Sequence, residues 1–521
     1  MTRRCRIRWL VGGVIWGTLA AAPGTATAAG PTVRYLGHHG PDGLLASPAT
    51  LSAAASTSRG RIVAVTFVLD GKPLGSDTRA PYVLDVTPGL LHPGRHRLRV
   101  LAVDSHGRRA STRPVTVKVS PSRARLLTAS PEHGLHAALE ALERGSVTVR
   151  LAPGRYVLEG IRLGRGARLL GSGPRTVIAP PAGSDYWAAL VAKGDDVRIA
   201  DLTVDGGGGG RREEGGIGVA VFDGSDRVRL QRLRLTRVRT HGVSVWGAHT
   251  DVSIQDSTIE SDGRGGSGVF VLGSDNSRDT SVIRTRIRGF RDFGILFGQR
   301  EYGRPAAALH GLALDNTIED VRDPARNACV TKPITTPRCG TNEGGIWSGG
   351  VEAAIIGNTI RRTRWDGIET VGSSTRTTVV DNRIFSTRTG IYVEHSTNQS
   401  LISANVIARA QTGINVEWWH EGQGSRSNTF TRNRIVRGGL FVDVGGDDNV
   451  ITDNVFVGGP RPAIVLQGSS RNVVRENLVC GGGDGDLVGE QVGKWDDGRR
   501  AFPRENQVED NRSAASCGGR S

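Results

Sequence analysis

The sequence predicts an all-β chain whose main part is a solenoid of stacked coils. Short apolar segments led by glycine recur at intervals of about 22 to 26 residues over most of the chain. Within each segment, apolar and polar residues alternate with period two, which is typical of a half-buried strand. Glycine makes up 73 of 521 residues, which suits a chain that turns after every short strand. Helical periodicity is nearly absent, which argues against leucine-rich or ankyrin arrays.

The first 28 residues have the pattern of a secretory signal peptide. Four arginines precede an apolar run from Trp9 to about Ala22, and Ala26–Ala28 offers a small-residue cleavage site. The run is short for a membrane span. We therefore expect a secreted, extracellular protein without stable membrane insertion.

The formal net charge is +16, and four of the positive charges come from arginines in the signal segment. The other arginines are spread along the predicted strands rather than clustered, which favours a solvated basic surface and does not indicate nucleic-acid binding. Such a surface would still attract an acidic polymer through long-range electrostatics. A solenoid with capped ends is compatible with a monomer, which is the state we expect.

Four cysteines remain after the signal segment, an even number that is compatible with disulfides in an exported chain. Cys329 and Cys339 flank a proline-rich loop, and Cys480 lies in a glycine-rich tail that ends near Cys517. We expect the pairs Cys329–Cys339 and Cys480–Cys517. A zinc site is the alternative, but the spacings do not fit and no paired histidine lies nearby.

Residues 31–120 are predicted to form a separate β-sandwich. Alternating runs at 63–70, 96–103 and 115–119 are separated by turns rich in Gly, Pro and Asp. The segments Val68–Gly75 and Pro93–Asp104 resemble the bacterial immunoglobulin-like modules that are attached to secreted carbohydrate-active enzymes. That resemblance implies a spacer or accessory role for this domain.

Residues 121–130 are predicted to be a linker, and residues 131–521 to form the solenoid with a C-terminal extension. Leu135, Leu139 and Leu142 recur at helical spacing, which predicts a short helix over 132–144. This helix would cap the apolar end of the first coil.

Two series of strands carry the repeat. The first apolar residues of the glycine-led strands are Ile217, Val243, Val269, Ile295, Ile346, Ile368, Ile391, Ile414, Leu440 and Ile464. The long step from Ile295 to Ile346 is expected to hold an extra coil over 309–318 and the first disulfide loop. Half a period later, a second series begins with asparagine: Asn316, Asn358, Asn382, Asn405, Asn433, Asn454 and Asn477. An asparagine at one corner can satisfy backbone groups there, so we interpret this series as structural.

The repetitive region resembles the right-handed parallel β-helix proteins of the pectate-lyase-like superfamily. The resemblance rests on the segments Leu151–Tyr156 and Ala200–Gly206 and on the alternation of Gly-Ile and Asn-x-Ile strands, and it covers about residues 124–518. The superfamily includes polysaccharide lyases, glycoside hydrolases, alginate epimerases, phage tailspikes and adhesins. The fold alone therefore does not decide the function.

The candidate site lies on the outward face of the glycine-led strands. When the first apolar residue is counted as position zero, positions zero and two point inward and positions one and three point outward. Position one reads Trp347, Glu369, Tyr392, Asn415 and Phe441, and position three includes Glu394, Glu417 and Asp443. Coils stack at roughly 4.8 Å, so the three acids of position three form a column about 10 Å long. Crowding should raise the pKa of at least one of them, which suits a general acid.

Glu369, Glu394 and Glu417 are the predicted catalytic residues. A pair on adjacent coils, Glu394 with Glu417, would suit a retaining glycosidase, and the wider pair of Glu369 with Glu417 would be nearer the inverting range. The sequence does not choose between them. The substrate-binding residues that we expect beside them are Trp347, Tyr392, Asn415, Trp418, Trp419, His420 and Asp443. Asp366 and Glu343 are second-tier candidates. His395 or His420 could serve as an acid or base, although a lone surface histidine is more often inert.

Three function classes remain. We expect a secreted glycoside hydrolase that needs no cofactor, because acids flanked by aromatic residues dominate the face. A polysaccharide lyase is the alternative and the basic charge supports it. The superfamily's lyases, however, commonly rely on Lys or Arg with Ca²⁺, and Lys193, Lys332 and Lys494 lie off the column. A non-catalytic glycan-binding surface protein is the third class. A stacked acid column can also bind Ca²⁺ or form an arginine-paired ladder without chemistry.

Overall fold

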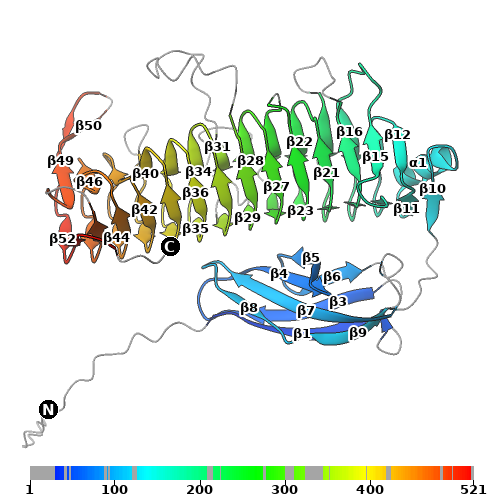
Figure 1. Cartoon of the computed structure of the whole chain (residues 1–521), viewed down its shortest axis with the longest axis horizontal. Helices are drawn as coiled ribbons and strands as arrows, with labels where there is room; N and C mark the ends of the chain where they lie inside the picture. Colours follow the sequence, from blue (N-terminus) through cyan, green and yellow to red (C-terminus); the bar gives the residue numbers. More distant parts are fainter. Residues whose placement is uncertain are drawn as a thin grey trace, which may run out of the picture.

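The computed structural model describes residues 30–39, 44–45, 49–86, 91, 94–119, 126–207, 215–222, 224–263, 265–273, 277–299, 310–322, 344–350, 352–372, 374–394, 396–417, 424–481, 485–495 and 497–517. The predicted signal peptide and both Cys329 and Cys339 lie outside these ranges. The described chain is all-β apart from one helix and forms an N-terminal β-sandwich followed by a long coil stack (Figure 1). None of its helices has the length and apolarity to cross a membrane.

The predicted immunoglobulin-like sandwich is confirmed. Its two sheets have the strand orders β1-β3-β6 and β2-β9-β7-β4-β5, and β8 adds to β7. The apolar side chains of both sheets, with Phe67, Leu98 and Val100 at the centre, form one core. The strands are β1 (Thr32–His39), β2 (Leu44–Leu45), β3 (Ala49–Ser56), β4 (Ile62–Leu69), β5 (Lys72–Asp77), β6 (Tyr82–Val86), β7 (Gly94–Asp104), β8 (Arg109–Ser111) and β9 (Val115–Val119).

The coil stack begins earlier than the predicted linker allows. Strand β10 (Leu127–Ala129) lies inside residues 121–130 and pairs in parallel with β11 (Thr148–Leu151). The alternation of Leu127, Thr128 and Ala129 places Ala129 in the core, which explains why this segment joins the first coil. Helix α1 (Leu135–Arg144) confirms the predicted cap, and it begins three residues later than expected because Gly134 precedes it at φ 71°. Its residues Ala138 and Leu142 pack into the solenoid core.

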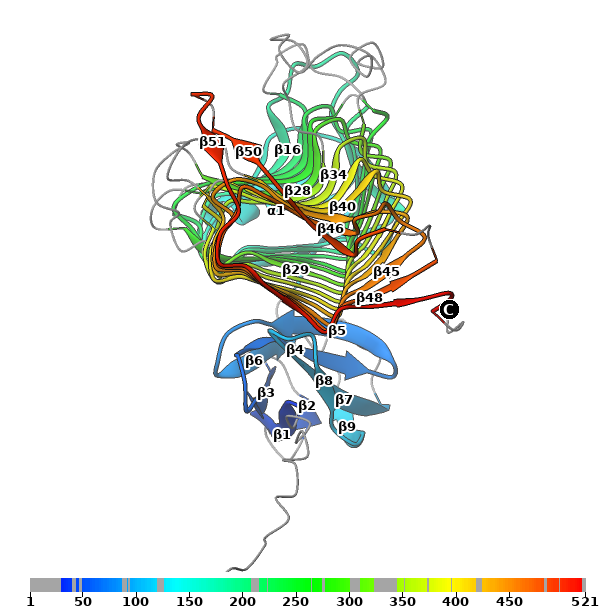
Figure 2. The same ribbon diagram turned by 90° about the vertical axis from the view of Figure 1, so that its left-hand side faces the viewer.

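Each coil contributes one strand to each of three parallel sheets, so the chain forms a β-helix (Figure 2). Sheet 1 contains β10, β11, β14 (Arg168–Leu170), β17 (Arg198–Ala200), β20 (Arg229–Gln231), β23 (Thr250–Gln255), β26 (Arg278–Ile283), β29 (Leu312–Leu314), β32 (Ala354–Ile356), β35 (Thr378–Val380), β38 (Leu401–Ser403), β41 (Thr429–Thr431), β44 (Val450–Thr452), β47 (Val473–Arg475) and β52 (Gln507–Glu509).

Sheets 2 and 3 have 14 and 13 strands. Sheet 2 contains β12 (Gly154–Val157), β15 (Thr176–Ala179), β18 (Thr203–Asp205), β21 (Arg234–Thr236), β24 (Thr258–Glu260), β27 (Arg286–Arg288), β30 (Thr317–Glu319), β33 (Thr359–Arg361), β36 (Arg383–Phe385), β39 (Val406–Ala408), β42 (Arg434–Val436), β45 (Val455–Val457), β48 (Leu478–Cys480) and β53 (Arg512–Ala514). Sheet 3 contains β13 (Ile161–Leu163), β16 (Ala188–Ala192), β19 (Ile217–Val221), β22 (His241–Gly247), β25 (Ser267–Gly273), β28 (Phe293–Gln299), β31 (Gly344–Ser348), β34 (Asp366–Thr370), β37 (Thr389–Val393), β40 (Thr412–Val416), β43 (Leu440–Val442), β46 (Ile464–Gln467) and β49 (Val488–Gln491). A small hairpin of β50 (Gly493–Lys494) and β51 (Arg500–Ala501) follows.

The predicted register of the glycine-led strands is confirmed in sheet 3. Ile346, Ile368, Ile391 and Ile414 are directly paired along the stack and fully buried. The extra coil expected between Ile295 and Ile346 is wrong, since these two residues are direct partners in adjacent strands. The segment over 309–318 instead supplies β29 and the start of β30, which belong to the coil that β28 begins.

The asparagine series forms a continuous hydrogen-bonded ladder, as predicted. The Oδ1 atom of Asn382 accepts from both the backbone N–H and the Nδ2 of Asn358, each at 2.9 Å. The Nδ2 of Asn382 donates to the carbonyl of Ile355 at 2.9 Å, so the side chain also bonds the backbone of the preceding coil. A second ladder, which the sequence pattern did not predict, lies at another corner and contains Asn428, Asn449, Asn472 and Asn506.

The disulfide predicted between Cys480 and Cys517 is confirmed, with Cα atoms 5.4 Å apart. It links the last residue of β48 to the segment that follows β53. The bond therefore ties the C-terminal segment to the preceding coil.

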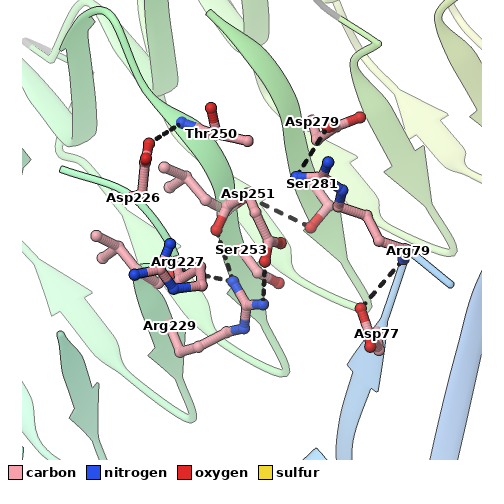
Figure 3. A network of polar contacts seen from close by, with 12 residues as sticks. Asp77, Arg79, Asp226, Arg227, Arg229, Thr250, Asp251, Ser253, Asp279 and Ser281 are labelled. Atoms are coloured by element: carbon pink, nitrogen blue, oxygen red, sulfur yellow. Dashed lines mark hydrogen bonds and ion pairs between the residues drawn. The ribbon is translucent and has the colours of Figure 1, made fainter. Parts of the chain in front are cut away.

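The sandwich packs against the outer face of sheet 1, so it is not a separated spacer (Figures 1 and 2). Val63, Ala64 and Val103 of the sandwich form one buried apolar cluster with Ile283, Leu312, Leu314, Ala354 and Ile356 of the β-helix. Polar contacts surround the cluster. Gln255 bonds both backbone groups of Ser76, at 2.9 and 3.0 Å. Arg79 lies 3.5 Å from Asp279 (Figure 3).

Candidate functional site

The outward residues of sheet 3 stack in the predicted columns. Trp347, Glu369, Tyr392, Asn415 and Phe441 are direct partners on five successive strands, β31 to β43. We call this position-one series the central column. Because parallel strands lie roughly 4.8 Å apart, each side chain lies directly above its neighbour.

The acids of position three also stack in register. The backbone N–H groups of Glu394, Glu417 and Asp443 each donate, at 2.9 Å, to a carbonyl of the preceding coil. The three residues therefore follow the ends of β37, β40 and β43 as one acid column. The predicted register of the three acids is therefore confirmed.

Asp366 adds a third column, at position minus two. It is paired with Thr389 and lies at the start of β34, where it is buried. Burial raises the pKa of Asp366 to about 7, and the negative charges of Glu394 and Glu417 also raise it. A hydrogen bond with Thr389 opposes these effects by lowering the pKa. Asp366 was only a second-tier candidate from the sequence, because its place near the acid column depends on the folded chain. We call Asp366, Glu369, Tyr392, Glu394, Glu417 and Asp443 the acidic cluster.

Glu417 is held by two donors from neighbouring positions. The hydroxyl of Tyr392 and the Nδ2 of Asn415 both donate to its Oε2, the second at 3.1 Å. Burial raises the pKa of Glu417, and the charges of Asp443 and Glu394 raise it further against those two hydrogen bonds. This agrees with the expectation that crowding raises a carboxyl pKa in the column.

Tyr392 and Asp443 complete the surroundings of Glu417. Burial raises the pKa of the Tyr392 phenol far above its usual range, and the charges of Glu394 and Glu417 add to the effect. Tyr392 therefore remains a proton donor at any ordinary pH. Burial also raises the pKa of Asp443, which the N–H of Val444 opposes by donating to Oδ1 at 2.8 Å.

The predicted catalytic residues differ in access. Glu369 and Glu394 are only 1% and 2% exposed, whereas Glu417 and Asp443 are partly exposed. The indole Nε1 of Trp347 donates to Oε1 of Glu369 at 3.1 Å, which fixes this buried acid beneath the outer surface. Each predicted catalytic pair thus joins one buried acid to the accessible Glu417.

Several predicted residues fall outside the ranges that the structure describes. They are Trp418, Trp419 and His420 of the expected sugar-binding set, together with Glu343 and His395. Within the described ranges, no group of three or more His, Cys, Asp or Glu side chains is arranged to hold a metal ion. The expectations about calcium and about the two tryptophans remain predictions.

Two family models match parts of the chain. Residues 42–100 match the bacterial Ig domain, and residues 296–461 match the family described as periplasmic copper-binding protein (NosD). No curated protein sequence matches the chain significantly.

Similar solved structures include β-helix proteins that act on polysaccharides. The mannuronan C-5 epimerase AlgE6 A-module of Azotobacter vinelandii is 13% identical, with 73% of this chain and 93% of that chain covered and a TM-score of 0.39. The family 28 exopolygalacturonase of Yersinia enterocolitica is 14% identical, with coverages of 90% and 94% and a TM-score of 0.39. A mannuronic acid-specific family 6 polysaccharide lyase from human gut microbiota is 12% identical, with coverages of 68% and 83% and a TM-score of 0.40.

Identities this low transfer neither a substrate nor a reaction to this chain. Each of the two family matches lies in one of the two domains that the structure describes. The three sheets of stacked parallel strands show that the second domain is a β-helix. The chain is a right-handed parallel β-helix protein joined to an N-terminal bacterial Ig-like domain.

Proposed function

We propose that the protein is a glycoside hydrolase that cleaves a polysaccharide on the outer face of sheet 3. The observation that carries the proposal is Glu417, a partly exposed carboxyl whose pKa is raised and whose Oε2 is fixed by Tyr392 and Asn415. A general acid must be protonated near the working pH and held in one orientation. The raised pKa of Glu417 moves it toward the first requirement, and the hydrogen bonds from Tyr392 and Asn415 to Oε2 supply the second.

The second carboxylate is Asp443 in this proposal. It follows Glu417 on the next coil and, like Glu417, is partly exposed, whereas Glu394 on the other side is buried. Adjacent coils place the two acids at the spacing of roughly 5 Å that suits a retaining enzyme. Glu417 donates its proton to the glycosidic oxygen while Asp443 attacks the anomeric carbon, and the leaving sugar departs as an alcohol. Water then cleaves the glycosyl ester as Glu417 takes its proton.

The charge of the acidic cluster favours hydrolysis over β-elimination. A lyase must neutralise a uronate carboxylate and remove the neighbouring proton, and a negative cluster repels that substrate. The described residues of the three columns between β31 and β43 are acids, amides, aromatics, threonines, glycines and aliphatics, without a lysine or arginine. We therefore place the bond to be cleaved between sugars that are uncharged at the site.

The matched NosD family is described as copper-binding, so copper must be considered as a ligand of the acidic cluster. Copper sites use imidazole or sulfur donors, whereas the acidic cluster offers carboxylate and phenol oxygens. The two cysteines within the described ranges are joined in a disulfide. The donor set of the cluster does not fit copper, and no step of the proposal uses it.

A polysaccharide panel tests the proposal. The full chain is incubated with neutral and uronate-rich glycans, and new reducing ends and the ultraviolet absorbance of unsaturated products are measured together. We expect reducing ends without absorbance, lost in Glu417→Gln and in Asp443→Asn. Asp453→Asn is the matched control, since Asp453 is an exposed turn residue at φ 57°, a conformation that asparagine accepts well.

Other outcomes would contradict the proposal in distinct ways. Absorbance with the reducing ends would mean β-elimination. Turnover that survives both substitutions but disappears in Glu394→Gln would favour the buried acid as the essential group. Binding without turnover on every glycan would favour the non-catalytic class.

A further inference from the structure

An aromatic surface occupies the same columns of sheet 3 on the N-terminal side of the acidic cluster. The central column continues from Trp347 through Leu296 to Phe270, and each residue is the direct partner of the next. The column of Asp366 continues to Phe293 and His241. We call His241, Trp246, Phe270, Phe293, Leu296 and Trp347 the aromatic tract. All six side chains are partly exposed.

Phe270 lies between the two flanking columns. The imidazole of His241 stacks on its ring with centroids 4.3 Å apart and planes at 13°, and the indole of Trp246 lies at 5.5 Å and 53°. Both neighbours belong to β22, at its start and near its end. One stacked and one tilted contact hold the Phe270 ring in a fixed orientation.

His241 adds no charge to this surface near neutral pH. Burial lowers its pKa to about 4, and its Nδ1 accepts a hydrogen bond from the N–H of Ser267 at 3.2 Å. The charged side chains near it include Arg291 and Asp292, which pair with each other at 2.9 Å. The tract is thus apolar and neutral where the neighbouring cluster is acidic.

Trp347 connects the two surfaces. Its indole lies over Gly298 and Gly349, where an added Cβ would come within 3.4 and 2.9 Å of the ring. The absence of side chains at these two positions leaves room for the indole to lie along the face. The same indole donates its N–H to Glu369 in the acidic cluster. The outer face therefore passes from aromatic to acidic without a break.

We propose that the aromatic tract binds several sugar rings of the polysaccharide whose bond is cleaved at Glu417. This inference rests on the proposed function. An aromatic ring offers a flat apolar surface that matches the C–H face of a pyranose, whereas an acid or amide recognises hydroxyl groups. From β22 to β40 there are six coil steps, or about 29 Å along the axis. The bound glycan runs parallel to the axis, and chain length determines its affinity.

The test compares long and short chains of the glycan that the panel identifies. Affinity is measured for the full chain on a background of Glu417→Gln, which prevents turnover, with a long oligosaccharide and with a disaccharide. We expect Phe270→Ala to weaken binding of the long chain about threefold to tenfold and to leave the disaccharide unchanged. Phe270→Leu keeps the apolar volume without the aromatic face, so it should show the same loss even if the alanine variant folds poorly.

The matched control is Phe502→Ala. Phe502 is half exposed but lies after β51, away from the three columns. The inference is overturned if Phe270→Leu binds the long chain as tightly as its parent, if short and long chains bind equally well, or if no glycan binds. A third outcome is that the protein shows no turnover, while its glycan binding still depends on chain length and on Phe270. That result would contradict the proposed hydrolysis but support the aromatic tract as a glycan-binding site.

Discussion

At the scale of single residues, Tyr392 lowers the proton affinity of Glu417 against the larger effect of burial. Its hydroxyl hydrogen bond stabilises the charged form of Glu417 and so lowers the Glu417 pKa against the effect of burial. Tyr392→Phe should therefore raise this pKa. If Glu417 is the general acid, the alkaline limb of kcat/KM against pH moves to higher pH in the variant. An alkaline limb that stays in place or moves to lower pH would contradict this assignment.

Asp366 makes a second prediction at the residue scale, this time for stability. Its pKa rises from the ordinary 3.8 to about 7 on folding, so the folded chain binds the proton more tightly than the unfolded chain. The contribution of Asp366 to the free energy of unfolding is therefore greatest below pH 4, and it is lost as the pH rises through 7. The shift corresponds to about 4 kcal/mol at pH 8, as an upper bound.

Asp366→Asn should remove that pH dependence. We expect the variant to unfold at a higher temperature than the parent at pH 8 and at a similar temperature at pH 4, measured by thermal unfolding in matched buffers. Asp453→Asn serves again as the control, because Asp453 is exposed. A variant that is equally destabilised at both pH values would show that Asp366 acts through packing or hydrogen bonding instead.

At the scale of the strand, each asparagine of the ladder should contribute more to the free energy of unfolding inside the stack than at its end. Asn405 donates to the carbonyl of Val379 and to Asn433, and it accepts from Asn382, all within a buried corner. Asn405→Ala leaves these groups without partners, at a cost of about 2 to 4 kcal/mol. Asn511, in the last coil, is the partly exposed counterpart. Equal losses of unfolding free energy in Asn405→Ala and Asn511→Ala would contradict this interpretation.

The strands also show how far the sequence determines the fold. Period-two alternation and the glycine-led repeat are local signals, so they predicted the register that pairs Ile368 with Ile391 and Ile414. The extra coil was wrong because length alone cannot say whether Leu312–Leu314 begins a new coil or completes an earlier one. The register also placed the acid column correctly. The burial of Glu369 depends on the Trp347 indole above it. The alternation of apolar and polar residues predicts which face a side chain lies on, but not whether a neighbouring side chain covers it.

At the scale of the molecule, the many arginines have a structural role that composition could not show. At one corner of the stack, residues of positive φ alternate between Asp and Arg: Asp201, Arg232, Asp256, Arg284 and Asp315. Arg232 bonds both oxygens of Asp201, and Arg284 bonds both of Asp256. The next position of this series is Gly357, and there Arg109 of the Ig-like domain bonds both oxygens of Asp315 instead. The docked domain thus supplies the arginine that the coil lacks.

This arrangement predicts that the two domains unfold together. Val103 lies in the apolar cluster between them and is buried, so Val103→Asp would place a charge in a dry interface at a cost of several kcal/mol. Undocking avoids that cost, and it uncovers apolar residues of sheet 1 such as Ile283 and Ile356. We expect one calorimetric transition in the parent and two in the variant, the first of them the sandwich.

Leu36→Asp is the control for this experiment, because Leu36 lies on β1, in the other sheet of the sandwich, and is 53% exposed. It should keep the single transition. If Val103→Asp also kept one transition at the parent's temperature, the interface between the two domains would contribute little to stability. If the variant also kept glycan binding and turnover, docking would stabilise the β-helix without shaping the outer face of sheet 3, which lies on a different side of each coil from sheet 1 (Figure 2).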